Sequence, residues 1–424
     1  MIQTQGTINS HLGLIPGWAD RKVGYSEQVG TQLKWWSNSF GRQNRDCKTQ
    51  MGPNLLADKS AIQMLSQHEL HRLFAHFNLV TCNVLLVEIL GDLKKWKDDE
   101  VLSTSEVRRL AKKLSGTRNC APHTDLVLGD LLGHNAPMTG QVPLAGGRRV
   151  SNKDGIGYFF DVSPENKAIL RWREGNFSEA EKELASHWRD LTGAIDLEAF
   201  QREHKGKVRK FKNLDNLHRY ICHVSHPTDT QSRRRLLVLV LGTLQVPVEA
   251  CGAIFSRWEQ MNGPDIEKFA PYAYYCFKVT QVFKHAVITR LVTPRRTNQV
   301  DMNYLYYLPF CQIFCSGDNF HRDLVPVFLR DNQSFVHADD LKKDLRQLND
   351  WYGSLTDDER RDRAYDYGGY PPIDEASVTY REWRKHMRPW SLGSGNKAVK
   401  MTKEENDALL KEIKEKMQTA GIDW

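Results

Sequence analysis

The amino-acid sequence predicts an α/β protein with a mainly parallel central sheet flanked by helices. Two short apolar runs, Asn54–Asp58 and Gln312–Ser316, have the length and composition of buried strands. Segments with helical apolar spacing follow each run and fill much of the chain between them. Strands that alternate with helices in this way favour a parallel sheet covered by helices.

The first half of this predicted domain spans residues 53–115 and follows a polar, irregular extension at 1–52. We expect a helix after the first strand and then a turn at His76–Val80. A strongly apolar helix at Val84–Leu93, with Glu88 in its middle, comes next. Charged residues with helical spacing complete this half.

A helix-rich insertion is expected at residues 116–269. Gly, Pro and Asn are frequent at 116–157, which predicts a long loop, and Ser163-Pro164-Glu165 has the pattern of a helix N-terminus. The most apolar run, Leu236–Phe255, contains Gln245, Pro247 and Glu249. These residues favour a buried helix or helix pair over a membrane span.

The second half of the domain is expected at residues 270–350. Asp301 opens an apolar, aromatic helix at Met302–Leu308, the second strand follows, and Leu341–Leu348 is helical. The charged tail at 351–424 is expected to end in a helix at Thr402–Gln418.

Composition narrows the class of protein. Hydrophobic residues make up 40% of the 424 residues, which indicates a packed core. A net charge of +7 permits an anionic partner without requiring one. The 8 cysteines include no C-x-x-C pair, so neither a structural zinc site nor a disulfide framework is expected. The N-terminus has no signal-peptide pattern, and a reducing cytoplasm is the expected location.

Four acidic residues stand in unusual local settings. Asp58 ends an apolar strand, Glu88 interrupts an apolar helix, Asp301 opens a helix, and Asp318 follows the second strand. Ligand sites of parallel sheets gather at the carboxyl ends of strands, so the four carboxylates are expected to converge. Clustered carboxylates need a cation, and oxygen ligands select Mg²⁺ or Mn²⁺. Such ions support phosphodiester hydrolysis.

Simpler interpretations of these residues remain open. Asp58 and Asp301 could be helix caps or turn formers, and Asp318 could belong to an ordinary turn. Glu88 could form a buried salt bridge with Arg or Lys. His321 could contact phosphate, but an ordinary surface histidine is the expectation. Asp323 could be an outer metal ligand, but a solvated helix residue is the expectation.

The order and spacing of these motifs resemble those of the PIN-like nuclease family. The matching pieces are Leu-Leu-Ala-Asp58-Lys-Ser60, Val-Leu-Leu-Val-Glu88-Ile-Leu, the segment from Asp301 to Phe310, and Ile-Phe-Cys-Ser316-Gly-Asp318. The resemblance covers residues 54–93 and 298–348. It implies a PIN-like sheet, metal ligation by the four acids, and RNA ahead of DNA as substrate. The 213 positions from Glu88 to Asp301 depart from a compact domain of this family.

Hydroxyl and basic residues are candidates for contacting the substrate. Ser60 and Ser316 could orient phosphate or water, or simply cap helices and turns. Lys210 and Lys212 lie in a basic run at 205–212 with one interleaved aromatic residue. Such a run suits phosphate contacts and base stacking, although a solvated helix face has the same composition.

Arg295 and Arg296 are further candidates for phosphate contacts, because they precede Asp301 by six and five positions. The sequence therefore predicts a metal-dependent nuclease with nucleic acid, RNA ahead of DNA, as its partner and no membrane association. The alternatives are a nucleic-acid-binding or scaffold protein that keeps the fold without turnover, and a phosphohydrolase that acts on other substrates.

Overall fold

The computed structural model describes residues 52–387, except 97–98, 145–146, 153–154, 161–162 and 360–370, together with residues 408 and 411. For 147–152 and 155–160 it describes the backbone alone. The predicted extension at 1–51 and the predicted helix at Thr402–Gln418 lie outside the described residues, apart from those two positions.

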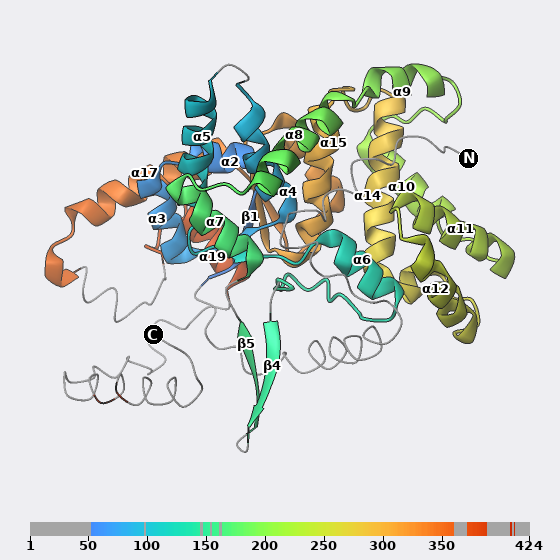
Figure 1. The fold of residues 1–424 in the computed structure, drawn as a ribbon, viewed down its shortest axis with the longest axis horizontal. Helices are drawn as coiled ribbons and strands as arrows, with labels where there is room; N and C mark the ends of the chain where they lie inside the picture. Colours follow the sequence, from blue (N-terminus) through green and yellow to red (C-terminus); the bar gives the residue numbers. More distant parts are fainter. Residues whose placement is uncertain are drawn as a thin grey trace.

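The centre of the fold is a 5-stranded parallel sheet with strand order β3-β2-β1-β6-β7 (Figure 1). This arrangement confirms the predicted fold class, an α/β protein with a parallel sheet flanked by helices, and is consistent with a PIN-like fold. The strands are β1 (Asn54–Ala57), β2 (Asn78–Thr81), β3 (Arg118–Asn119), β6 (Ile313–Ser316) and β7 (Ser334–His337).

The first strand lies at the middle of the sheet and joins the two halves of the chain. Leu56 of β1 pairs with Val80 on one side and with Phe314 on the other. The chain therefore proceeds from β1 to β2 and β3 in one direction, and returns much later to β6 and β7 on the opposite side. The crevice between the carboxyl ends of β1 and β6 is a topological switch point, where ligand sites of such sheets form.

Helices of the first half connect β1 to β2 and β3. Ser66 begins α3 with a capping box in which Glu69 is the third helical residue, so the start of this helix is encoded locally. The predicted turn at His76–Val80 is wrong, because β2 occupies most of it and its short apolar run is buried between β1 and β3. The helices are α2 (Lys59–Met64), α3 (Gln67–His76), α4 (Asn83–Leu90), the 3₁₀ helix η1 (Gly91–Lys94) and α5 (Glu100–Lys113).

Helices make up most of the chain between β3 and β6, and most of them lie to one side of the sheet in Figure 1. The loop predicted at 116–157 is wrong in part, since it contains β3, α6 and most of a protruding β-hairpin. The elements are α6 (His123–Leu131), β4 (Gly147–Asn152), β5 (Gly155–Phe160), α7 (Pro164–Glu174), α8 (Glu179–Gly193), α9 (Leu197–His204), α10 (Leu214–Val224), α11 (Thr230–Thr243), α12 (Val248–Gln260), α13 (Ile266–Phe269) and α14 (Pro271–Ile288).

The run Leu236–Phe255 forms a helix pair, the end of α11 and the start of α12. Its side chains are buried only in part, with Leu237 and Ile254 inside and Val238 and Val248 exposed. Among the described residues, no helix is both long enough and apolar enough to cross a lipid bilayer.

The second half returns the chain to the sheet. The predicted helix at Met302–Leu308 is mostly the 3₁₀ helix η2 (Asn303–Phe310). Pro309, inside η2, has no N–H to donate to the Leu305 carbonyl. The Tyr275 hydroxyl donates to that carbonyl instead, at 2.7 Å. The remaining elements are α15 (Thr297–Met302), α16 (Asn319–Leu324), the 3₁₀ helix η3 (Val325–Phe328), α17 (Ala338–Ser354) and α19 (Val378–His386).

Candidate carboxylate site

Asp58 follows β1 directly and is the N-cap of α2. Its Oδ1 accepts a hydrogen bond from the Ala61 backbone N–H at 2.8 Å, and the Ser60 hydroxyl lies 2.8 and 2.9 Å from the two carboxylate oxygens. The helix-cap interpretation is therefore correct for Asp58. It does not exclude a site, since the cap stands at the switch point of the sheet.

The end of β6 meets Asp58 from the other side of the switch point. The Ser316 hydroxyl donates to Asp58 Oδ2 at 2.6 Å and accepts from the Asp318 backbone N–H at 2.9 Å. The Gly317 N–H donates to Ser60 Oγ at 2.9 Å. A Cβ at Gly317 would lie 2.8 Å from the end of the Met64 side chain and 3.3 Å from Ser60 Oγ, so a larger residue here would require these side chains to shift. These contacts tie the two halves of the chain together.

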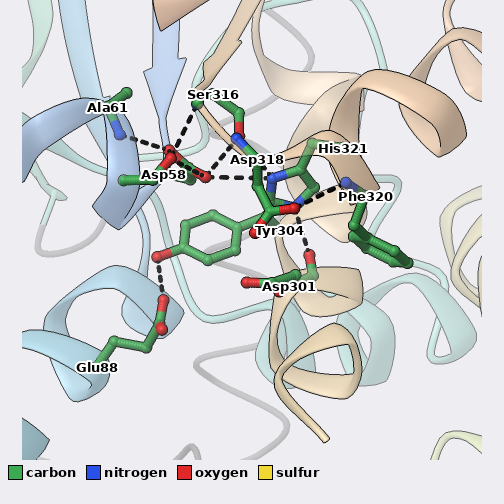
Figure 2. A network of polar contacts seen from close by, with 11 residues as sticks. Asp58, Ala61, Glu88, Asp301, Tyr304, Ser316, Asp318, Phe320 and His321 are labelled. Carbon is green, nitrogen blue, oxygen red and sulfur yellow. Dashed lines mark hydrogen bonds and ion pairs between the residues drawn. The ribbon is translucent and has the colours of Figure 1, made fainter. Parts of the chain in front are cut away.

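His321 lies at the centre of this network and is fully buried, which corrects the expectation of a surface histidine (Figure 2). Its Nε2 is 2.9 Å from the Asp301 carbonyl oxygen, which can only accept, so Nε2 carries a proton. Its Nδ1 faces Ser316 Oγ at 2.8 Å and Asp58 Oδ2 at 3.2 Å. A lone pair on Nδ1 would face a carboxylate oxygen, so a second proton and an imidazolium ion fit this position.

The charges of the pair support this assignment. Burial lowers the pKa of His321, but the hydrogen bond and charge of Asp58 and the charge of Asp301 outweigh it and raise the pKa to about 9. Burial likewise raises the pKa of Asp58, while hydrogen bonds and charge from His321, with hydrogen bonds from Ser316 and Ala61, bring it below its usual value. At neutral pH the two form a buried ion pair.

Glu88 projects from α4 toward the same region. The Tyr304 hydroxyl donates to its Oε2 at 2.5 Å. Burial raises the pKa of Glu88 above its usual value, and the charges of Asp58 and Asp92 act in the same direction. Lys59 and the Tyr304 hydrogen bond oppose the shift without cancelling it. Glu88 therefore holds a proton more readily than an ordinary glutamate does.

Asp301 lies near the end of α15, so the prediction that it opens a helix is wrong. Of the four acids, it has the fewest hydrogen-bond donors or cations to offset the burial of its carboxylate. Its Oδ2 is buried and has no hydrogen-bond partner among the described residues. Burial raises the pKa of Asp301 well above its usual value, and the charges of Glu88, Asp318 and Asp58 raise it further, while His321 lowers it. The structure thus brings the four predicted acids close enough that the charges of Glu88, Asp318 and Asp58 act on Asp301.

Asp318 is the N-cap of α16, and its Oδ1 accepts from the Phe320 N–H at 2.7 Å. Asp318 is therefore a helix cap and not part of an ordinary turn. Like Asp58, it combines a local capping role with a position at the switch point.

Three charged residues beside the acids were not predicted. The Lys59 ammonium lies 2.7 Å from Asp92 Oδ2 and donates to the Glu88 carbonyl at 3.0 Å. Arg189 of α8 lies 2.8 Å from Asp92 Oδ1 and connects the insertion to this region. The spacing of Glu88 and Asp92, four residues apart in a helical segment, is the sequence signal that could have identified Asp92.

The described side chains do not form a ready metal centre, since no three His, Cys, Asp or Glu side chains are grouped so that they could hold an ion. Asp58 is fully engaged by hydrogen bonds and His321, and Asp92 is paired with Lys59 and Arg189. Glu88, Asp301 and Asp318 lack such ion pairs within the described part of the chain. The buried, unpaired Oδ2 of Asp301 fits a cation as its missing partner.

The remaining predicted residues divide into two groups. Ser60 and Ser316 belong to the network, where both hydrogen-bond Asp58. Arg295 and Arg296 are exposed at the start of α15, the helix that carries Asp301, and no contact with the four acids is described for them.

Lys210 and Lys212 are exposed between α9 and α10 and contact none of the four acids in the described structure.

No model of a known protein family matches the chain, and neither the curated proteins nor the solved structures compared with it gave a match.

Proposed function

We propose that this protein hydrolyses phosphodiester bonds in nucleic acid, RNA ahead of DNA, with the help of Mg²⁺ or Mn²⁺. The observation that carries the proposal is the buried, unpaired Oδ2 of Asp301 beside Glu88 and Asp318 at the switch point. The preference for RNA rests on the resemblance to PIN-like nucleases and on no feature of the site.

Each residue of the network has a distinct role in this proposal. Asp301, Glu88 and Asp318 would hold the cation, which would activate water and offset charge that develops on the phosphate. As these side chains lie, they would have to draw together around the ion. Asp58 accepts hydrogen bonds from Ser60 and Ser316 and positions the strand ends, and the charge of His321 offsets part of the repulsion between Asp58 and the other acids.

A second candidate function is nucleic-acid binding without turnover. One observation favours it: Asp58, the acid that ends the first strand, is already satisfied by protein donors and by the His321 cation. A site in which a histidine cation supplies part of the positive charge that a metal ion would supply could keep the fold without catalysing hydrolysis.

A cleavage assay with the full chain separates the two candidates. Labelled single-stranded RNA and DNA are incubated with Mg²⁺, Mn²⁺ or a chelator. Asp301→Asn and Asp318→Asn should each reduce metal-dependent cleavage by more than about 100-fold, since each removes a ligand charge. Asp323→Asn is the matched control, because Asp323 is an exposed acid of the same helix as Asp318.

Three outcomes are decisive. Cleavage that survives in both site variants would not come from this site, and the proposed carboxylate nuclease would be abandoned. Binding of RNA without cleavage under any metal would favour the second candidate. Loss of cleavage in Asp323→Asn as well would mean that charge in general, and not the site, is responsible.

The cytoplasm is the compartment that we propose for this activity. The 7 described cysteines are all free thiols, and 5 of them are buried, which suits a reducing environment.

A further inference from the structure

The segment from Lys205 to Tyr220, which joins α9 to α10 and includes the first half of α10, carries a concentrated positive charge. It holds six basic residues and one acidic residue, Asp215. All six basic side chains are exposed, and none forms an ion pair with a carboxylate among the described residues. The six are Lys205, Lys207, Arg209, Lys210, Lys212 and Arg219.

Two aromatic rings accompany this charge. The ring centroids of Phe211 and Tyr220 are 5.1 Å apart, and both side chains are half-buried. The Arg209 guanidinium lies 6.0 Å from the Phe211 centroid and 5.8 Å from the Tyr220 centroid. A cation held beside two partly exposed rings offers a phosphate contact and a flat apolar surface in one place.

The position of this segment relative to the acids suits a common ligand. α10 packs against η3, where His218 and Phe328 make an edge contact at 5.2 Å between centroids. η3 directly follows α16, whose N-cap is Asp318. One short helix and one 3₁₀ turn span on the order of 15–20 Å, so a bound strand of several nucleotides could reach both regions.

We infer that the segment Lys205–Tyr220 binds single-stranded RNA, with its lysines on successive phosphates and an unpaired base against Phe211 and Tyr220. This inference rests on the proposed function for its ligand class. A single strand fits better than a duplex because stacking on an aromatic ring needs an unpaired base. The strand would then continue past η3 toward Asp318.

Binding without chemistry tests the inference. A fluorescein-labelled oligouridine RNA of about 16 nucleotides, the upper range for single-strand sites, is titrated with the full chain in chelator. Affinity is measured by anisotropy between about 50 and 200 mM KCl. The triple variant Lys207→Ala, Lys210→Ala, Lys212→Ala should reduce the slope of log affinity against log salt by about 2, at roughly 0.7 per phosphate contact.

The control triple variant removes the same charge from other surfaces. Lys112, Lys167 and Lys343 are exposed residues of α5, α7 and α17. Their replacement by Ala should leave the slope within about 0.5 of the wild-type value, since general attraction is weaker than direct contacts. Equal slope changes in the two triple variants would overturn the inference.

Phe211→Leu tests base stacking separately from charge. Leucine keeps apolar packing at this half-buried position and removes the ring, so affinity for the RNA should fall roughly 5- to 100-fold. Circular dichroism verifies that the helices persist. A polyglutamate peptide that binds as tightly, with the same dependence on Phe211, would indicate an acidic protein partner and overturn the RNA inference.

The outcomes also separate this inference from the proposed function. If the protein cleaves nothing but binds RNA in a salt-dependent way that the Lys substitutions weaken, the binding inference stands and the nuclease proposal is wrong. If the protein cleaves RNA with metal and the Lys substitutions leave binding unchanged, the nuclease proposal stands and the binding inference is wrong.

Discussion

His321 Nδ1 lies 3.2 Å from Asp58 Oδ2 although 263 positions separate the two residues. Both side chains are buried, and Ser316 bridges them through hydrogen-bonding distances of 2.6 and 2.8 Å. The pair joins the carboxyl ends of two neighbouring strands from opposite halves of the chain. It therefore links the stability of the fold to the charge balance of the candidate site.

Removing His321 should destabilise the protein strongly. His321→Leu leaves Asp58 buried without its cation, and the free energy of unfolding should fall by about 3–5 kcal/mol. Urea denaturation measures the change. Arg322→Leu, at the next and exposed position of α16, is the control and should change stability by about 0.5 kcal/mol or less.

A double-mutant cycle shows whether this loss comes from the pair. Adding Asp58→Asn to His321→Leu removes the buried, unpaired charge of Asp58. The double variant should therefore lose less unfolding free energy than the sum of the losses in the two single variants, by about 1 kcal/mol or more. Additive losses would mean that the two residues stabilise the fold independently.

Divalent metal should stabilise the protein through Asp301. Ligand at about 100 times its dissociation constant adds about 2.7 kcal/mol, which a melting curve with Mn²⁺ detects. Asp301→Asn should abolish this gain. The same variant should melt at a higher temperature than wild type in chelator, because it removes a buried carboxyl whose pKa burial and neighbouring acids raise.

The metal result has a clear contrary outcome. A wild-type midpoint that does not move at millimolar Mn²⁺ would argue against a cation at this site. A stabilisation of equal size in Asp301→Asn would assign the metal to other residues.

Lys113 should stabilise the helix that Asp58 begins. Its ammonium donates to the carbonyls of Ile62 and Leu65 at 2.8 and 2.5 Å, at the end of α2. Lys113→Met leaves these buried acceptors unpaired, at a cost of about 1–3 kcal/mol in unfolding free energy. Lys112→Met, at the exposed neighbouring position, should have little effect in the same urea titration. Equal effects would show that the carbonyls find other donors.

His123 should make stability fall in mild acid. Its buried ring stacks on Tyr306 at 4.8 Å between centroids, and burial lowers its pKa to about 4. The neutral form is preferred in the folded state, so stability is complete above the unfolded pKa of about 6.5 and is lost as pH falls toward 4. By pH 5 this group alone costs about 2 kcal/mol.

His123→Phe retains a stacked ring without a titrating group. The difference in unfolding free energy between pH 7 and pH 5 should shrink by about 2 kcal/mol in this variant. The same pH dependence in wild type and variant would mean that other groups determine acid stability.

The sequence by itself determined the local elements around the site. The apolar runs of β1 and β6, the apolar α4 around Glu88, and the Ser163-Pro164 start of α7 are each encoded within a few residues. Apolar spacing and capping chemistry act at short range, so the fold class and the local settings of Asp58, Glu88 and Asp318 could be predicted. Asp301 was expected to open a helix and instead lies near the end of α15.

Tertiary structure decided the partners of those residues. β2 could be identified only once β1 and β3 lay on either side of it, because four residues carry too little pattern alone. The ion pair of His321 with Asp58, and the link from Lys59 through Asp92 to Arg189, join residues far apart in the chain. Whether a buried charge is paired or left for a cation depends on such long-range packing, which periodicity and spacing do not encode.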